Sequence, residues 1–239
     1  MLVEELQKAH KSLKRNQKAL QYLYNRGFDD ESIKEFQIGF VTKRGKWEDL
    51  EDLKERIVIP LTLEGEPFSA IGRRIDEHTH EKYRIANKYL FTKANYLFNF
   101  DKSTIERRRL GTVYIVEGVF DAIALWMKGY AVVATLGSLL SKQQLYKLKH
   151  YFPNVVLAFD GDEAGLKAML NFYRYYKDEL AYALPDGDED YGNNKAIPRI
   201  VSIEEIATQY YIKRHGDMPQ IYKKLIVNTL VYGTFLPRT

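Results

Sequence analysis

The sequence predicts an α/β protein built around a parallel β-sheet with crossover helices. From residue 113 onward, short apolar runs alternate with helical patterns, and the connections between them are short. Such alternation is typical of a parallel sheet whose strands are joined by helices. The expected strands are residues 113–116, 130–135, 154–159 and 181–184, and the expected helices are residues 120–129, 141–151 and 166–180.

The regions on either side of this alternating pattern have a different character. Residues 1–38 have apolar positions at helical spacing, and residues 55–75 read as two strands joined by a turn at "LEGE". Residues 83–100 are rich in aromatic side chains and have no clear period, and the chain from about residue 195 is mostly helical in pattern. We therefore expect three parts: an N-terminal basic α+β subdomain (1–110), a central α/β domain (111–192) and a C-terminal helical segment (193–239).

The composition excludes several classes of protein. The chain has 239 residues, 45% of them hydrophobic and 28% charged, which is ordinary for a globular protein. It has no cysteine, which excludes disulfides, thiolate catalysis and a zinc site built on sulfur, and which fits a reducing cytoplasm. No apolar stretch approaches the roughly 20 residues of a membrane span, and the N-terminus is too polar for a signal peptide.

The charged residues are unevenly distributed along the chain. The net charge is +4; lysine and arginine crowd the first 110 residues, while acidic residues cluster between 117 and 190. A basic region beside an acidic centre suits a polyanionic substrate that is held for metal chemistry. The alternative is that these charges only solvate the surface.

Acidic side chains follow three of the expected strands. Because ligands of parallel sheets bind beyond the carboxyl ends of the strands, these acids are expected at one edge. Carboxylates of this kind select Mg²⁺ or Mn²⁺. Gly161, between two of the aspartates, is expected to let the backbone bend. The acids are Glu117 after the first strand, Asp160 and Asp162 after the third, and Asp186, Asp188 and Asp190 after the fourth.

Each acidic group also has a simpler explanation. Glu117 with Gly118 could form a plain turn, and Asp121 could be a solvated acid favoured by the helix dipole. The Asp-Gly-Asp at 160–162 could be a polar turn, and residues 185–190 a solvated loop. Their joint occurrence at the ends of predicted parallel strands favours a metal site.

The motifs resemble a known family. "VYIVEGVFDAIAL", "VVATLGS" and "VVLAFDGDEAGLKA" closely resemble the Toprim domain of bacterial DnaG-type DNA primases. Upstream, "LKERIVIPL", "GEPFSAIGRRI" and "EKYRIANKYLFTKANYLFNFD" resemble the basic subdomain of those primases, and "YLYNRGFDDESIKEFQIGF" their N-terminal helix. The resemblance covers roughly residues 20–190. It implies a Toprim-type parallel sheet with flanking helices, preceded by a mixed α+β basic subdomain and followed by a short helical segment.

The resemblance assigns roles to the acidic residues. Glu117 resembles the family's glutamate that acts as general acid/base or metal neighbour, and Asp121 matches an aspartate four residues later. Asp160 and Asp162 resemble the principal metal ligands. Asp188 and Asp190 resemble the third acidic cluster, but the family pattern there is D-P-D or D-P-E, so Asp186 is a rival.

The resemblance also assigns basic residues to the binding of template phosphates and the incoming triphosphate. For Lys82 and Lys93 the alternative is an ordinary surface lysine. The basic residues are Lys54 and Arg56 in an R-x-R-like pair, Arg73 with Arg74 as its neighbouring alternative, Lys82 and Lys93.

The implied function is DNA-dependent RNA synthesis: short RNA primers made on single-stranded DNA with Mg²⁺ or Mn²⁺ and nucleoside triphosphates. A replicative helicase is an expected partner. The family's zinc ribbon and helicase-binding domain have no counterpart in the sequence, so either separate chains supply these functions, as in a split or phage-like primase, or the protein is a minimal variant. The expected location is the bacterial cytoplasm, or the host cytoplasm for a phage protein. The alternatives are a Toprim nuclease and a non-catalytic replisome accessory protein; a haloacid-dehalogenase-type phosphatase would not explain Glu117-Gly118.

Overall fold

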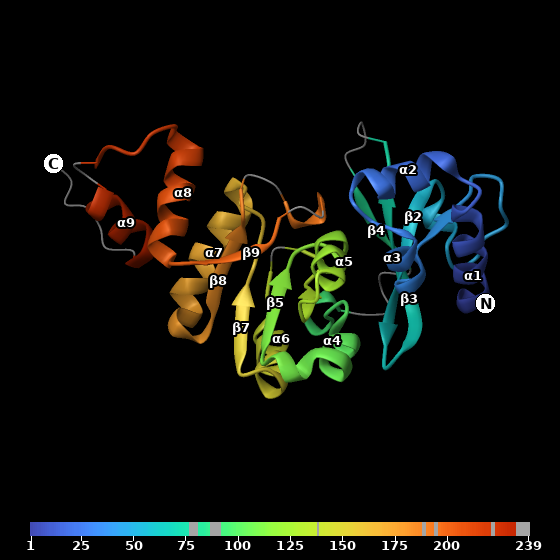
Figure 1. Ribbon diagram of the computed structural model, residues 1–239, viewed down its shortest axis with the longest axis horizontal. Coiled ribbons are helices and arrows are strands. Elements are labelled where there is room, and N and C mark those ends of the chain that lie inside the picture. The colour runs from blue at the N-terminus through green and yellow to red at the C-terminus, as the bar shows by residue number, and fades with distance from the viewer. Residues whose placement is uncertain are drawn as a thin grey trace. The chain divides into compact units, whose positions relative to one another are not determined.

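The computed structural model describes residues 1–76, 81–86, 92–137, 139–187, 190–193, 196–220 and 223–232. The chain forms two compact units, Met1–Asp101 and Lys102–Thr239 (Figure 1). The sequence-based division placed its first boundary at residue 110 and treated the residues after 192 as a separate part; that third part stays a prediction.

Unit 1 combines short helices with an antiparallel sheet. Its four strands have the order β1-β2-β3-β4, and each neighbouring pair is antiparallel. The elements are α1 (Leu2–Leu13), α2 (Gln17–Asn25), α3 (Asp30–Glu35), β1 (Gly39–Val41), the 3₁₀ turn η1 (Glu51–Leu53), β2 (Arg56–Leu63), β3 (Glu66–Arg74), β4 (Tyr83–Ile85) and η3 (Lys93–Asn95), and α4 (Phe100–Arg107) leads into unit 2.

The predicted pair of strands in residues 55–75 is confirmed as the hairpin β2–β3. Leu63 pairs with Glu66, so only Glu64 and Gly65 form the loop. Both loop residues have positive φ, 54° and 85°, as in the tight turns that match the twist of a hairpin. This hairpin aligns Arg56 with Arg74 across the two strands.

The core of unit 1 lies where α1 packs on the sheet. The buried cluster includes Leu6 and Ala9 of α1, Val58 of β2 and Ala70 of β3. Gly39 of β1 allows this packing, because a Cβ atom there would stand 2.7 Å from the carbonyl carbon of Ala9. The helical pattern of residues 1–38 thus becomes three helices, with the first buried against the sheet.

Unit 2 contains the predicted parallel sheet. Its strand order is β6-β5-β7-β8-β9; β6, β5, β7 and β8 are parallel, and β9 is antiparallel to β8. The elements are η4 (Arg108–Leu110), β5 (Thr112–Val116), α5 (Val119–Met127), β6 (Val132–Ala134), α6 (Lys142–Tyr151), β7 (Asn154–Leu157), α7 (Glu163–Tyr176), η5 (Lys177–Glu179), β8 (Ala181–Pro185), η6 (Tyr191–Asn193), β9 (Pro198–Val201), α8 (Ile203–His215) and α9 (Lys223–Tyr232).

The alternating strands and helices confirm the predicted α/β architecture, and the described chain after residue 195 is mostly helical, as expected, with the short strand β9 as an unexpected addition. This strand has only four residues, two of which are exposed. So short and half-exposed a strand has no recognisable period in the sequence. The following helices α8 and α9 pack against α7. Across the described residues, none of the helices has the length and apolar character to cross a membrane.

Candidate active site

The sheet of unit 2 brings three acid-bearing segments to one edge. Glu117 directly follows β5, Asp160 comes three residues after the end of β7, and Asp186 directly follows β8. These three strands are neighbours and run parallel, so their carboxyl ends share one edge of the sheet (Figure 1). The expected placement of these acids is therefore a feature of the fold.

Glu117 has a carboxyl group with a strongly raised pKa. Burial, followed by the negative charges of Asp160 and Asp162, raises the pKa of Glu117 to about 7. Among the described residues, Glu117 forms no ion pair with a lysine or arginine. Acids from two strand ends thus act on each other electrostatically, and no basic side chain of the described residues compensates Glu117.

The backbone holds the Asp-Gly-Asp turn against the start of α7. The Oδ1 of Asp162 accepts a hydrogen bond of 2.8 Å from the Gly165 amide and caps the helix. A Cβ atom at Gly165 would lie 2.2 Å from the carbonyl oxygen of Asp160, so only glycine fits. The backbone bends at Gly161, as expected, but the bend does not require glycine, since its φ is not positive and a Cβ there would meet its nearest atom at 3.9 Å.

Asp121 lies in the first turn of α5 and points back to the turn before it. Its Oδ2 accepts a hydrogen bond of 3.1 Å from the Gly118 amide. This contact stabilises the start of the helix and the turn that carries Glu117. The aspartate therefore has at least a structural part in shaping this edge.

The third acidic segment contributes a buried aromatic residue that the sequence patterns did not place among the site residues. Tyr191 is 0% exposed on η6, which packs against α5. Burial, then the charges of Asp160 and Asp121, raises the pKa of its hydroxyl. Tyr191 Oη and Asp190 Oδ1 are both buried and have no hydrogen-bond partner among the described residues. An aromatic residue that directly follows an acidic run was the available sequence signal.

The described aspartates of the third acidic segment, Asp186 and Asp190, differ in burial. Asp188 lies outside the described residues, and Asp186 is exposed, with its backbone amide donating to the carbonyl of Ile197 at 3.0 Å. Asp190, by contrast, is half-buried and places one carboxylate oxygen in the protein interior.

The donor set of this edge is suited to a hard cation. Within the described part of the chain, no three acidic or histidine side chains already surround one point closely enough to hold a metal ion. The available ligands are carboxylate oxygens, one of which is buried without a described partner, and repulsion between them is uncompensated at Glu117. Oxygen ligands that leave part of a coordination shell to water are those that Mg²⁺ accepts.

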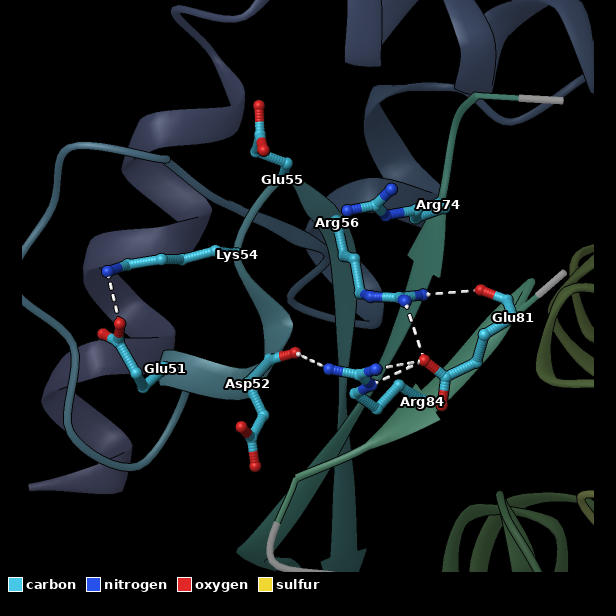
Figure 2. A pocket seen from close by; sticks show the side chains of 8 residues that line it. All are labelled: Glu51, Asp52, Lys54, Glu55, Arg56, Arg74, Glu81 and Arg84. Atoms are coloured by element: carbon cyan, nitrogen blue, oxygen red, sulfur yellow. Dashed lines mark hydrogen bonds and ion pairs between the residues drawn. The ribbon is translucent and has the colours of Figure 1, made fainter. Parts of the chain in front are cut away.

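Unit 1 contains a second candidate site, a charged pocket of about 500 Å³ (Figure 2). Figure 2 shows Arg56 and Arg84 directed at the same carboxylate oxygen of Glu81. The distance is 3.3 Å from Arg56 Nη2. The pocket is lined by Glu51, Asp52, Lys54, Glu55, Arg56, Arg74, Glu81 and Arg84.

The three arginines of this pocket differ in how they are compensated. Arg56 is only 3% exposed and donates to the backbone oxygens of Glu81 and Lys82 at 3.2 and 3.4 Å. Its pKa is lowered by burial, then by the neighbouring charge of Arg84. The buried Nε of Arg74 has no hydrogen-bond partner among the described residues. The pocket therefore crowds cationic groups, and Arg74 keeps donors available for an anion.

The remaining basic residues predicted to bind nucleotides or DNA lie in different surroundings. Arg73 is 4% exposed, donates from Nε to Tyr22 Oη at 2.5 Å and from Nη1 to Tyr83 Oη, and stacks 4.9 Å from the centre of the Tyr83 ring. Lys54 pairs with Glu51, and Lys82 is exposed. The side chain of Lys93 is not among those that the structure describes. The structure gathers Lys54, Arg56 and Arg74 in one pocket but places Arg73 inside the unit.

Two family models match the chain. Residues 114–191 match a Toprim-like model, and residues 7–53 match the N-terminal domain of the DNA primase catalytic core. The DNA primase of Thermotoga maritima is 33% identical over 198 residues, which are 71% of this chain and 35% of that protein. The chain therefore spans about a third of the length of this curated relative.

Solved primase structures share the fold. A DNA primase domain from Pseudomonas aeruginosa matches with a TM-score of 0.68 and 20% identity, covering 97% of this chain and 95% of that chain. A DnaG primase catalytic domain bound to ssDNA matches with a TM-score of 0.61 and 20% identity, covering 88% and 83%. The family models, the sequence relatives and the shared fold lead to one conclusion: the chain belongs to the DnaG-type DNA primase family.

Proposed function

We propose that the chain is a DNA-dependent RNA polymerase that makes short RNA primers on single-stranded DNA by metal-dependent nucleotidyl transfer. The observation that carries this proposal is the electrostatic coupling of Glu117 to Asp160 and Asp162, which belong to the ends of two neighbouring parallel strands. Such coupling is costly unless a cation joins the cluster. Membership of the primase family gives the chemistry that the cation would serve.

The metal site is proposed at the acidic edge of unit 2. Asp160 and Asp162 would hold a divalent cation, Mg²⁺ or Mn²⁺, with Glu117 beside them and Asp188 and Asp190 as further ligands. When bound there, the metal would activate the attacking 3′-hydroxyl and stabilise the negative charge on the leaving pyrophosphate. Asp121 would take part by holding the Gly118 turn, through the hydrogen bond described above.

Glu117 would accept the proton of the attacking 3′-hydroxyl. Without a bound metal ion, the pKa of Glu117 is raised to about 7, so that its carboxyl group exchanges a proton readily at neutral pH. Beside the metal ligands it is therefore our candidate for accepting the proton of the attacking hydroxyl. Its partial burial limits the access of water, which is the same factor that raises its pKa.

The pocket of unit 1 would bind phosphate groups. Arg74 and Lys54 would reach phosphates of the template or the incoming triphosphate, and Arg56 would support them from its buried position. The ion pairs to Glu51 and Glu81 would then be exchanged for phosphate contacts. Lys82 and Lys93 are proposed as additional backbone contacts, while Arg73, enclosed by two tyrosines, would shape this surface rather than touch the nucleic acid.

The proposed partners follow from this activity. The template is single-stranded DNA, the nucleic acid to which the related DnaG catalytic domain described above is bound, and the substrates are nucleoside triphosphates. A replicative helicase and a separate zinc-ribbon or helicase-binding chain are proposed as partners. We place the protein where replication occurs, in the bacterial cytoplasm or, for a phage protein, in that of the host.

The test is primer synthesis on single-stranded DNA with ribonucleotides and Mg²⁺. We expect Asp160→Asn and Asp162→Asn each to lower the rate at least about a hundredfold, because each removes an anionic ligand of the metal. Asparagine still caps a helix, so Asp162→Asn should fold normally. The matched control is Glu163→Gln, which neutralises the adjacent exposed acid of the same turn and should keep wild-type activity.

Two results would contradict the proposal. One is full primer synthesis by both aspartate variants. The other is shortening of the DNA by the wild-type chain without formation of new oligonucleotides, which would identify the chain as a nuclease. Incubation of template with and without ribonucleotides separates these two activities.

A further inference from the structure

Unit 2 has a groove of about 500 Å³ on the side of α7 that the proposed chemistry does not use. It starts in the first turn of the helix, two residues after Asp162, and continues to the last turn. At 1.5 Å per residue, the helical distance from Ala164 to Tyr175 is about 16 Å. Its lining includes Leu139, Ala164, Lys167, Asn171, Arg174 and Tyr175.

The groove combines exposed apolar groups with positive charge. Tyr175 is 82% exposed and Leu139 is 81% exposed, and neither side chain makes a hydrogen bond or ring contact with another described residue. Lys167 and Arg174 are exposed on the same side of the helix, and none of the described residues that line the groove is acidic. Arg174 also donates to the carbonyl of Leu230 at 2.8 Å, which anchors one end of its guanidinium.

This combination matches one kind of ligand better than others. An exposed tyrosine ring offers a stacking surface for a base, and cations spaced along a groove attract a phosphate backbone. An apolar protein segment would use Leu139 and Tyr175 but would leave Lys167 without a partner. Charge complementarity therefore favours a single-stranded nucleic acid.

The place of the groove favours the template over the product. It extends about 16 Å from the turn that carries Asp162. The template occupies such a path from the first step, whereas a product reaches it only after several additions. We propose that the α7 groove, with Tyr175 as the stacking residue and Lys167 as a phosphate contact, binds the single-stranded DNA template beside the catalytic edge; this inference rests on the proposed primase function.

The test is the binding of fluorescein-labelled single-stranded DNA of mixed sequence by the full chain, measured by anisotropy. We expect Tyr175→Ala to raise Kd at least about fivefold, as for the loss of one stacked base. Lys167→Ala should reduce the slope of log K against log salt by about 0.7, the contribution of one phosphate contact on a single strand. Both sites are exposed helix positions that tolerate alanine.

Matched controls are Tyr146→Ala on α6 and Lys213→Ala on α8, which remove an exposed tyrosine and an exposed lysine outside the groove. Wild-type DNA affinity in both groove variants, an equal loss in the controls, or a loss confined to single-stranded RNA would overturn the inference.

Failure of the groove and failure of the proposed function give different results. If the wild type makes primers and the groove variants bind DNA normally, the inference about the groove is wrong and the proposed primase function stands. If Tyr175→Ala weakens DNA binding but the wild type makes no primers, the groove stands as a DNA-binding surface and the polymerase assignment fails.

Discussion

The charged pocket of unit 1 and the acidic edge of unit 2 differ in whether their charged side chains have partners of opposite charge. In the pocket, Arg56 and Arg84 share the carboxylate of Glu81, and Lys54 pairs with Glu51. At the edge, Glu117 faces the like charges of Asp160 and Asp162 without a basic partner among the described residues. In the pocket, Lys54, Arg56 and Arg84 have carboxylate partners, and Arg74 keeps a buried donor without one; at the edge, none of the described basic side chains pairs with Glu117.

This difference separates two kinds of charged site. Where opposite charges satisfy each other, removal of one partner should affect mainly stability. Where like charges are held together, removal of one should relieve repulsion and affect mainly function. The following predictions test that distinction, starting with the largest expected change in stability.

The first prediction concerns the backbone turn that carries Asp160 and Asp162. Gly165→Ala should lower the free energy of unfolding by about 3 kcal/mol or more, because the new Cβ would meet the carbonyl oxygen of Asp160, which is backbone and cannot move aside. Gly161→Ala is the matched control, since its Cβ would have 3.9 Å of space, and it should be nearly neutral. Urea unfolding of both variants measures the contrast; equal stabilities would mean that the turn adapts easily.

The second prediction concerns the paired charges in the pocket of unit 1. Arg56→Met should destabilise the fold by about 3 kcal/mol, because it leaves two carbonyl oxygens and Glu81 without a buried partner. Arg84→Met is the control: it pairs with the same carboxylate but is exposed, so its loss should cost less than about 1 kcal/mol. Thermal and urea melts compare the two variants, and a larger cost for Arg84 would reverse our view of the pocket.

The third prediction concerns the like charges at the acidic edge of unit 2. The folded-state pKa of Glu117 is raised to about 7 from an ordinary value of 4.5, so folding favours its protonated form. Its contribution to stability is therefore full below pH 4.5 and is lost as the pH rises through 7. One pKa unit corresponds to about 1.4 kcal/mol, and after allowance for partial exposure we expect Glu117→Gln to stabilise the metal-free protein by about 2 kcal/mol at pH 8.

The pH dependence supplies the control for this prediction. At pH 4, where Glu117 is protonated in both folded and unfolded chains, glutamine and glutamic acid should give nearly equal stabilities. Melting curves from pH 4 to 8 without divalent cations measure the difference between wild type and variant. A variant that is less stable at pH 8 would show that Glu117 has a compensating partner.

The smallest expected effect is at Tyr191. Its buried hydroxyl has no hydrogen-bond partner among the described residues, so Tyr191→Phe should raise the free energy of unfolding by about 1 kcal/mol. The matched control is Tyr210→Phe on α8. Tyr210 is also buried, but its hydroxyl accepts a hydrogen bond of 2.8 Å from Arg214, so its replacement should not raise the free energy of unfolding. Urea unfolding compares the two variants. A loss of stability at Tyr191 would identify a bond to the acids beside it.

The sequence by itself determined the α/β architecture and the placement of acids at the carboxyl edge of the parallel sheet. Alternating apolar runs and helical patterns lead to a parallel sheet, because strands joined by helices have few other ways to bury both faces. Once the strands are parallel, their carboxyl ends share an edge, so the positions of Glu117, Asp160 and Asp162 followed from their place after strands. These inferences rest on local patterns along the chain.

Only the tertiary structure decided which charges are buried, paired or exposed. Arg56 and Arg73 look alike in the sequence, yet one lines a pocket and the other is enclosed by Tyr22 and Tyr83, which come from separate elements. The need for glycine at 165 rather than 161 depends on one carbonyl oxygen in a folded turn. Strand β9 and the buried position of Tyr191 likewise depend on packing against distant elements, which no local pattern specifies.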